Sequence, residues 1–506
     1  MSVSDLILAV DIGTSATKAV LFDPDVNQVA IARKHYPIHT PHKGWSEQEP
    51  EVILTAVLEA IREITDCLPE RTRILGISFS AQLCSVLAVD MDGKALTNSL
   101  IWSDTRSAGI AESISQRSVA RVISQRTGCP IDAIYPLSKI LWLKENVELP
   151  ESASFVSIKE YVIFRLTGQW VVDWSIASAT GLCDIAKHEW NDTALSLLGL
   201  TAANLSELVS PRSFFAKWDK DMTDLMGLPP DVPLVIGGGD GPMATIGVGA
   251  FDSSSLAINL GTSAAARVII SRPEVDPEGR LWTYVVDEDL WVIGGVVSSG
   301  GIVYDWLLKN LFSGTEEAKY DVLTRHVHEY ADRLAAAVPP GSANLIFIPY
   351  LAGELSPDWR PHTRGSFFGL DLVHNRGHLV RAVLEGITRS IYRVSESVQS
   401  LLNTQFNEIR VTGGLTSSST WLQIAADMLG IPVLVPESVE GSARGAAMLA
   451  MVALGLKSGI EDFGDLMATR QCIDTRAEIH AYYERQYPKF EELLEYARRF
   501  HGDWEV

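Results

Sequence analysis

The chain has 506 residues, 42 of them Lys or Arg and 63 Asp or Glu, which gives a formal net charge of −21. Hydrophobic residues make up 46% and charged residues 21%, a balance that excludes a disordered or collagen-like chain and fits a globular protein of two or three domains. The acidic charge argues against nucleic acid as the main partner, because affinity for a phosphate backbone depends on Lys and Arg.

The first predicted element is a buried strand over residues 6–10, followed by a tight turn and a return strand over residues 17–22. Asp11 ends the apolar block, no basic segment precedes it, and no apolar run reaches the roughly 20 residues that cross a bilayer. The five cysteines are too scattered for a disulfide framework or a zinc site. We therefore expect a cytoplasmic protein with reduced thiols and no membrane partner.

Strands and helices are predicted to alternate through the rest of the chain. The predicted strands are 74–79, 85–89, 232–236, 256–260, 266–270, 409–412 and 431–435, and the predicted helices are 51–67, 139–145, 379–401 and 421–429. This alternation in both halves indicates the α/β class, with sheets covered by helices.

One local plan occurs twice. A strand, a turn containing Gly-Thr-Ser and a second strand are predicted around residues 13–15 and again around residues 261–263. The matching flanks favour duplication over coincidence and predict two copies of one domain type. We place the domains at residues 1–248 and 249–506.

The first of these turns has the pattern of a phosphate-binding loop. Gly13 permits close approach of the backbone to a phosphate, and the hydroxyls of Thr14 and Ser15 can donate to phosphate oxygens. Lys18 can supply a positive charge. Asp11, at the strand end, is placed to hold Mg²⁺, which prefers a few carboxylates together with water and phosphate. The alternative is an ordinary Asp/Gly hairpin turn.

A glycine-rich turn in the middle of the chain carries a further carboxylate. Asp240 lies in the sequence Gly237-Gly-Gly-Asp-Gly241, directly after a predicted strand. A carboxylate in this position can accept a proton from a substrate hydroxyl. The alternative is a helix N-cap, because Asp caps helices well and the following Gly-Pro favours a helix start. The two interpretations are compatible.

Two more turns offer backbone and hydroxyl groups at strand ends. Gly261, Thr262 and Ser263 form a second set of phosphate donors. Gly413 and Gly414 follow the strand at 409–412 and would let a flat ring lie against the backbone. The small residues of 441–448 open a helix and permit close approach of either a packed helix or a nucleotide.

The chain resembles the FGGY carbohydrate kinases over nearly its full length. The sequence Phe367-Phe-Gly-Leu370, followed by His378-Leu379 and Ala382-Val-Leu-Glu385, is similar to the C-terminal signature of that family. The resemblance implies two actin-like (ribonuclease H-like) domains flanking a catalytic cleft. It also implies that the second domain holds most of the ATP and the first most of the sugar, with Mg²⁺ as the metal.

Individual roles follow from the same resemblance. Asp240 corresponds to the general base and Asp11 to the aspartate linked to Mg²⁺, and we assign both carboxylates to the metal site. Gly301 and Ser418 are assigned to the nucleotide side, with Ser418 where some members place an Asn near the adenine. The implied reaction is in-line transfer of the ATP γ-phosphoryl group to a primary sugar hydroxyl. A homodimer is a family-level expectation.

Within the family the chain looks most like the gluconate kinase branch. The similar stretches are 44–48, 157–161 and 173–182, of which the first is shared with pentulose kinases. The loop 80–85 should contact the sugar through Gln82 and Cys84. Its Leu83-Cys84 replaces a Met-His pair common in both branches, which removes a hydrogen-bond donor from the expected polyol site.

A gluconate carboxylate needs a cation nearby. Arg106 and Lys159 are the candidates, the alternative being ion pairs with Asp104 or Glu160. Trp102 can stack on the sugar or belong to the core. Two other functions stay open, namely a ketopentose or polyol kinase of the xylulose or ribulose type, and an actin-like or chaperone-like ATPase.

Overall fold

The computed structural model describes residues 4–69, 72–312, 325–437 and 440–502. The chain packs as two compact units. The first contains Met1–Phe251, Ile269–Ile293 and Glu440–Met467, and the second contains Asp252–Val268, Gly294–Val439 and Ala468–Val506. No helix in the described ranges combines the length and apolar character needed to span a bilayer. All five cysteines are free.

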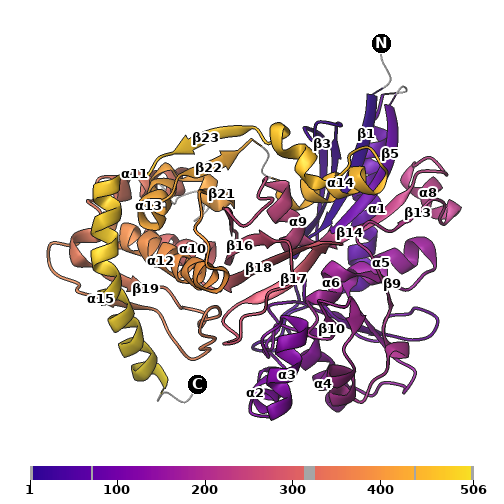
Figure 1. Ribbon diagram of the computed structural model, residues 1–506, viewed down its shortest axis with the longest axis horizontal. Helices are drawn as coiled ribbons and strands as arrows, with labels where there is room; N and C mark the ends of the chain where they lie inside the picture. Colours follow the sequence, from indigo (N-terminus) through magenta and orange to yellow (C-terminus); the bar gives the residue numbers. More distant parts are fainter. Residues whose placement is uncertain (1–3, 70–71, 313–324, 438–439, 503–506) are drawn as a thin grey trace. The chain divides into compact units, whose positions relative to one another are not determined.

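The first unit is built on a six-stranded mixed sheet in the order β13-β14-β5-β1-β2-β3. Its strands are β1 (Ser4–Ile12), β2 (Ala16–Phe22), β3 (Gln28–His35), β5 (Thr72–Ala81), β13 (Phe214–Phe215) and β14 (Leu234–Gly239). The central strands β14, β5 and β1 are parallel, and β2 returns antiparallel to β1 as the predicted hairpin. Figure 1 shows these strands beside one another.

Helices and short strands complete this unit. They are β4 (Glu47–Gln48), α1 (Pro50–Asp66), β6 (Leu87–Val89), β7 (Ser99–Leu100), α2 (Ala108–Ser115), α3 (Ser118–Thr127), α4 (Pro136–Asn146), β8 (Ser154–Val156), α5 (Ile158–Thr167), β9 (Val171–Asp173), α6 (Trp174–Ser178), β10 (Cys183–Asp184), β11 (Glu189–Trp190), α7 (Asp192–Leu198), β12 (Glu207–Val209), α8 (Lys220–Met226), α9 (Asp240–Gly247), β17 (Trp282–Asp287) and α14 (Gly441–Ala453). Helix α1 starts with Pro50 at its first turn and buries Ile53, Val57 and Ile61, which share one helical face, in the same core as the sheet.

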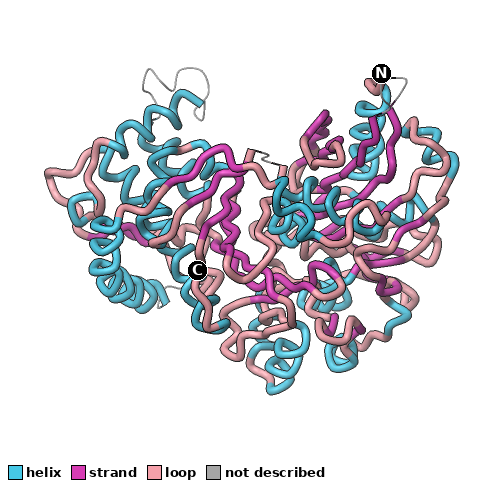
Figure 2. The backbone as a smooth tube through the Cα atoms, turned by 45° about the horizontal axis from the view of Figure 1, so that its top comes forward, coloured by secondary structure: helices cyan, strands magenta, loops and turns pink. Residues whose placement is uncertain are grey.

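The second large sheet has seven strands in the order β17-β18-β16-β15-β21-β22-β23. The remaining elements are β15 (Ser255–Leu260), β16 (Ala264–Ile270), β18 (Leu290–Val297), α10 (Gly301–Phe312), α11 (Arg325–Ala336), β19 (Ile346–Ile348), β20 (Ser366–Phe368), α12 (Arg376–Leu402), β21 (Glu408–Gly413), α13 (Ser419–Leu429), β22 (Val433–Pro436), β23 (Thr469–Ile473) and α15 (Ala477–Gly502). The strands β15, β21 and β22 are parallel, with β16 antiparallel to β15. Figure 2 shows the long helices of this unit beside its strands.

The predicted strands and helices are confirmed, with shifts at their ends. The strand expected at 85–89 is shorter and starts at Leu87, three residues after Cys84, whose backbone is left-handed (φ 61°) and not extended. The strand expected at 232–236 begins after Pro233, which has no N–H to donate to the sheet. Two mixed sheets together with the helices between their strands confirm the predicted α/β class.

The two compact units are not two continuous segments that meet between residues 248 and 249. The segment Glu440–Met467 packs with the first unit although it follows most of the second in sequence. Its helix α14 lies against β1, β5 and α9. A Cβ atom on Gly445 would lie 2.0 Å from the Met243 carbonyl oxygen of α9, and one on Gly247 2.0 Å from that of Gly441. The small residues of 441–448 therefore serve close helix packing.

Candidate active site

Three parallel strands of the first unit bring the predicted catalytic residues together at their carboxyl ends. Asp11 is the penultimate residue of β1 and is paired in register with Ser80 of β5, which is in turn paired with Gly238 of β14. Asp240 follows two residues later. Because polar groups collect where parallel strands end, this edge of the sheet is the candidate site of the first unit.

Asp11 is buried in an unusual electrostatic environment for a carboxyl. The Ser80 hydroxyl donates to its Oδ1 (3.1 Å), and the Lys18 Nζ lies 3.8 Å from its Oδ2. Burial raises the pKa of Asp11 to about 6, and the negative charge of Asp240 adds to the increase while Lys18 opposes it. Two neighbouring carboxylates of this kind fit a divalent cation.

Asp240 is the first residue of α9, and its Oδ1 accepts the backbone N–H of Gly241 (2.7 Å). The N-cap position is Gly239, so the capping interpretation of Asp240 is wrong by one residue. Glycine is required at position 237 of the preceding strand β14, because its φ is 73° and a Cβ there would lie 2.0 Å from the Phe79 carbonyl oxygen.

The predicted phosphate loop is held by side chains that sequence reasoning did not assign to it. The Tyr36 hydroxyl donates to the Gly13 carbonyl (2.5 Å), and the Gln48 Nε2 donates to the Thr14 carbonyl (2.6 Å). The Thr14 hydroxyl accepts from the Trp102 indole N–H (3.2 Å), while Ser15 is exposed. These bonds fix the loop and link it to the expected sugar side.

Lys18 has a carboxylate partner from a distant part of the chain. Its Nζ lies 2.6 Å from Oε2 of Glu440, whose Oε1 also pairs with Arg33 (3.1 Å). Glu440 immediately precedes α14 and is buried. The sequence contains no signal for this pair, because the two residues are 422 positions apart.

On the sugar side, Gln82 and Cys84 lie in one loop, as predicted. The Gln82 Nε2 donates to Oε1 of Gln48 (2.8 Å), which connects the loop to Thr14. Cys84 is buried, with its Sγ 3.4 Å from the Ala179 carbonyl oxygen. Burial raises its pKa to about 12, so the thiol is neutral and has no nucleophilic character.

The two candidate cations for a substrate carboxylate are both paired. Arg106 binds Asp104 and Glu47 (each 2.7 Å) and lies over the Trp45 ring. The Lys159 Nζ pairs with Asp173 (2.8 Å) and donates to the Gly238 carbonyl (3.2 Å).

These pairs are buried, so they are not the surface ion pairs considered from sequence. The sequence suggested Asp104 as the partner of Arg106, and the structure has this pair. It suggested Glu160 for Lys159, which pairs instead with Asp173.

Within the second unit, the other predicted turns meet at the ends of β15 and β21. The Gly301 N–H donates to the Gly261 carbonyl (2.8 Å), and the Ile302 N–H donates to the Thr262 carbonyl (3.1 Å), so the turn that ends at Ser263 is fixed to the start of α10. Gly413, with φ 78°, is paired in register with Leu260.

The start of α13 lies close in sequence to this second group. Gly414 opens a short helical turn, after which the Ser418 hydroxyl caps α13 by accepting the Trp421 N–H (3.0 Å). Ser418 also donates to the Asp332 carboxylate. Its hydroxyl is therefore used for structure, and an adenine contact would have to compete with these bonds.

The two aspartates at the strand ends of the first unit fit a Mg²⁺ ion that is held by few protein ligands. In the described part of the chain, no group of three or more His, Cys, Asp or Glu side chains could enclose a metal. Mg²⁺ does not need one, because it is usually held by one or two carboxylates, water and substrate phosphates. Asp11 and Asp240 supply such a pair.

Comparison with known proteins agrees with this geometry. The model for the N-terminal domain of the FGGY family of carbohydrate kinases matches residues 6–247, and the model for its C-terminal domain matches residues 256–454. The chain is 38% identical over 471 residues to the gluconokinase of Bacillus subtilis (91% of this chain, 90% of the relative). It is 29% identical over 460 residues to the xylulose kinase of that organism (90% of each).

Solved structures show the same similarity. The gluconate kinase from Lactobacillus acidophilus gives a TM-score of 0.92 at 32% identity, covering 99% of this chain and 100% of that one. The ligand-bound xylulose kinase from the same organism gives 0.92 at 31% identity with the same coverage. The family models match both halves of the chain, and the two mixed sheets agree with them: the chain belongs to the FGGY family of carbohydrate kinases.

Proposed function

We propose that this kinase transfers the γ-phosphoryl group of ATP to the primary hydroxyl of D-gluconate and forms 6-phospho-D-gluconate. The observation that carries the proposal is the identity of 38% to a gluconokinase, against 29% to a xylulose kinase of the same organism. Kinases of this family use ATP. The substrate is therefore a sugar or sugar acid, and gluconate is the one that the identities favour.

In the proposed mechanism, Asp240 accepts the proton of the attacking hydroxyl. Its position at the junction of strand β14 and helix α9 would hold the carboxylate in place, which favours proton transfer. Bound Mg²⁺, held by Asp11 and Asp240, would neutralise charge on the phosphate oxygens. The loop from Gly13 to Lys18 would orient the transferred group, because the loose transition state is stabilised mainly by positioning and charge.

The remaining proposed contacts divide between the two units. For the nucleotide we propose Gly261, Thr262, Ser263, Gly301, Gly413, Gly414 and Ser418, and for the sugar Gln82, Cys84, Trp102, Arg106 and Lys159. The buried ion pairs of the last two favour a role in shaping the sugar pocket, since their charges are already balanced.

A ketopentose kinase is the second candidate. The xylulose kinase structure with a TM-score of 0.92 supports it. An ADP-release assay across gluconate, xylulose, ribulose, glycerol and erythritol discriminates the two. We expect the highest kcat/KM for gluconate. A higher kcat/KM for either ketopentose would contradict the gluconate proposal and support that sugar as the substrate.

An ATPase independent of sugar is the alternative of another class. We expect ATP turnover to be slow without sugar and to accelerate when gluconate is added, because the acceptor otherwise has to be water. Full-rate ATP hydrolysis in the absence of any sugar would contradict the kinase proposal. A homodimer, also proposed, is tested by sedimentation velocity.

A further inference from the structure

Helix α12 carries three buried arginines on its long path through the second unit. Arg381, Arg389 and Arg393 have exposed fractions of 5%, 5% and 7%. A buried guanidinium has five N–H donors and a full charge, so it costs free energy unless acceptors surround it. The three sites can be compared directly, because they lie on one helix and bury the same group.

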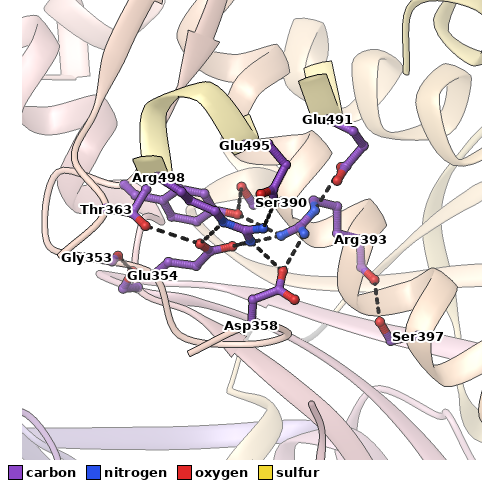
Figure 3. A network of polar contacts seen from close by, with 12 residues as sticks. Gly353, Glu354, Asp358, Thr363, Ser390, Arg393, Ser397, Glu491, Glu495 and Arg498 are labelled. Atoms are coloured by element: carbon purple, nitrogen blue, oxygen red, sulfur yellow. Dashed lines mark hydrogen bonds and ion pairs between the residues drawn. The ribbon is translucent and has the colours of Figure 1, made fainter. Parts of the chain in front are cut away.

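Two of these arginines are fully provided with partners. Arg381 donates to Glu385 (2.8 Å), to the Val338 carbonyl (3.0 Å) and to the Tyr483 hydroxyl. Figure 3 shows the surroundings of Arg393, where carboxylates from a loop and from α15 converge on it. Its partners are Glu354 (2.8 Å), Asp358 (2.5 Å) and Glu491 (2.9 Å).

Arg389 differs from both neighbours. Within the described ranges its guanidinium makes no hydrogen bond and no ion pair, although it lies over the rings of Tyr483 (5.6 Å) and Phe490 (5.5 Å). Burial lowers the pKa of this guanidinium, which is the direction expected for a poorly compensated cation. Its N–H groups are therefore available to a ligand.

These N–H groups border a small cavity between α12, α15 and the loop that begins at Gly341. The cavity has a volume of about 20 Å³, and Arg389, Asn344, Tyr482 and Gln486 are among its lining residues. The last three side chains also form no hydrogen bond to any residue that the structure describes. The Tyr482 hydroxyl lies against the loop, since a Cβ on Gly341 would be 2.0 Å from it. Each of these side chains can donate a hydrogen bond.

Three arginines and one carboxylate act on the Tyr482 hydroxyl at the cavity, and the carboxylate, Glu385, is itself a lining residue. The arginines are Arg389, Arg381 and Arg485. Oε1 of Glu385 accepts from the Gly341 N–H (2.9 Å), Arg381 and the Tyr483 hydroxyl (2.7 Å), and its Oε2 accepts from the Ser342 hydroxyl (3.2 Å). Within the described ranges Glu385 makes these bonds and forms no hydrogen bond or ion pair with Arg389.

We propose that this cavity binds a small monovalent anion, which accepts hydrogen bonds from the Arg389 guanidinium and the neighbouring neutral donors. Its volume admits one or two particles of the size of water, each of which needs about 10–15 Å³. An ion such as chloride fits this space, whereas phosphate, with its four oxygens, exceeds it. The site lies outside the residues proposed for ATP and sugar, and its occupancy does not depend on the identity of the sugar.

The test compares thermal stability in chloride with stability in a bulky anion at constant ionic strength. When sodium chloride replaces sodium isethionate, we expect the Tm of the wild type to rise saturably by about 2–4 °C, because the ligand binds the folded state. Arg389→Met should abolish the rise and should be at least as stable as the wild type in isethionate, since the unpaired cation is gone.

A matched control separates specific binding from general screening. Arg376→Met removes one positive charge from the exposed first turn of the same helix, and this variant should keep the chloride response. Equal responses in wild type and Arg389→Met would overturn the proposal.

If Arg389→Met does not fold, Tyr482→Phe provides the same comparison and should raise the chloride concentration at half-effect. Crystals of the wild type soaked in bromide supply an independent measurement. They should show anomalous density for bromide beside Arg389. If bromide occupied other positions fully and no density lay beside Arg389, the result would count against the site.

Discussion

At the scale of single residues, Asp240 carries the proposed proton transfer. Asp240→Asn keeps the size and the helix start but cannot accept the hydroxyl proton, so we expect kcat to fall by about 10²–10⁴-fold with an unchanged Tm. Asp231→Asn, an exposed change in the loop before β14, is the matched control and should leave kcat unaltered. Steady-state kinetics with gluconate and ATP would refute the role if both variants turned over alike.

Lys159 offers a second test at this scale. Lys159→Met leaves Asp173 buried without its counter-charge, and we expect a loss of about 3–5 kcal/mol in the free energy of unfolding. Lys159→Met with Asp173→Asn should recover part of that loss, which urea denaturation would reveal.

Steady-state kinetics of the double variant then test whether Lys159 binds the carboxylate of gluconate. A KM that increases for gluconate and not for xylulose would assign Lys159 to carboxylate binding. Equal changes for both sugars would leave it as a residue that supports the β14 end through Gly238.

The sequence predicted the residues that lie close together along one strand and turn. Asp11, Gly13 and Lys18 belong to one hairpin, so their grouping follows from a tight turn. Glu440 could not be predicted as the partner of Lys18, because the pair forms only when α14 packs in the first unit. Gln48 belongs to the stretch 44–48, which resembles gluconate and pentulose kinases, but its bond to the phosphate loop depends on tertiary structure.

At the scale of elements, the start of α5 makes stability dependent on pH. Glu160 forms a capping box with Ser157, and burial raises the pKa of Glu160 from 4.5 to about 7. The folded state thus binds this proton more tightly, and the associated stability is present below pH 4.5 and is lost as the pH rises through about 7.

Glu160→Gln preserves the acceptor for the Ser157 N–H and removes the ionisation. We therefore expect its free energy of unfolding to decline less between pH 5 and 8 than that of the wild type, as measured by urea titrations. Glu151→Gln, at an exposed position, serves as the control. Parallel curves for all three proteins would show that Glu160 does not cause the dependence.

The crossing of α9 and α14 links helix packing to catalysis. Gly445→Ala introduces a Cβ 2.0 Å from the Met243 carbonyl oxygen and must push α14 away from the helix that starts at Asp240. We expect a loss of about 1–3 kcal/mol in stability and a reduced kcat.

Gly464→Ala is a suitable comparison, because a Cβ there meets nothing within 4 Å and the residue is not left-handed. Thermal melts and kcat values for the two variants would contradict the packing account if they coincided.

Most elements were predictable because their signals are local. The apolar block at 6–10 and the regular spacing from 379 to 401 are patterns within one strand and one helix. The start of β6 was not predictable, since nothing in the local sequence indicates the left-handed backbone of Cys84. The choice between helix packing and nucleotide binding for 441–448 also required knowing that α9 is its neighbour.

At the scale of the whole molecule, the chain does not divide once between its units. The sequence predicted two related halves from the repeated Gly-Thr-Ser plan. The return of residues 440–467 to the first unit involves no change in composition, so only the folded structure reveals it. The same return supplies both the Lys18 partner and the helix that packs on α9, which makes this segment part of the proposed site.

The central claim is that Asp240 enables phosphoryl transfer from ATP to the primary hydroxyl of gluconate. The most direct measurement is the ³¹P NMR spectrum of the product formed from gluconate, ATP and Mg²⁺ by the wild type and by Asp240→Asn. The account predicts a single phosphate ester on the terminal carbon with the wild type and almost none with the variant. A wild type that leaves gluconate unmodified while it phosphorylates xylulose, or a variant as productive as the wild type, would contradict it.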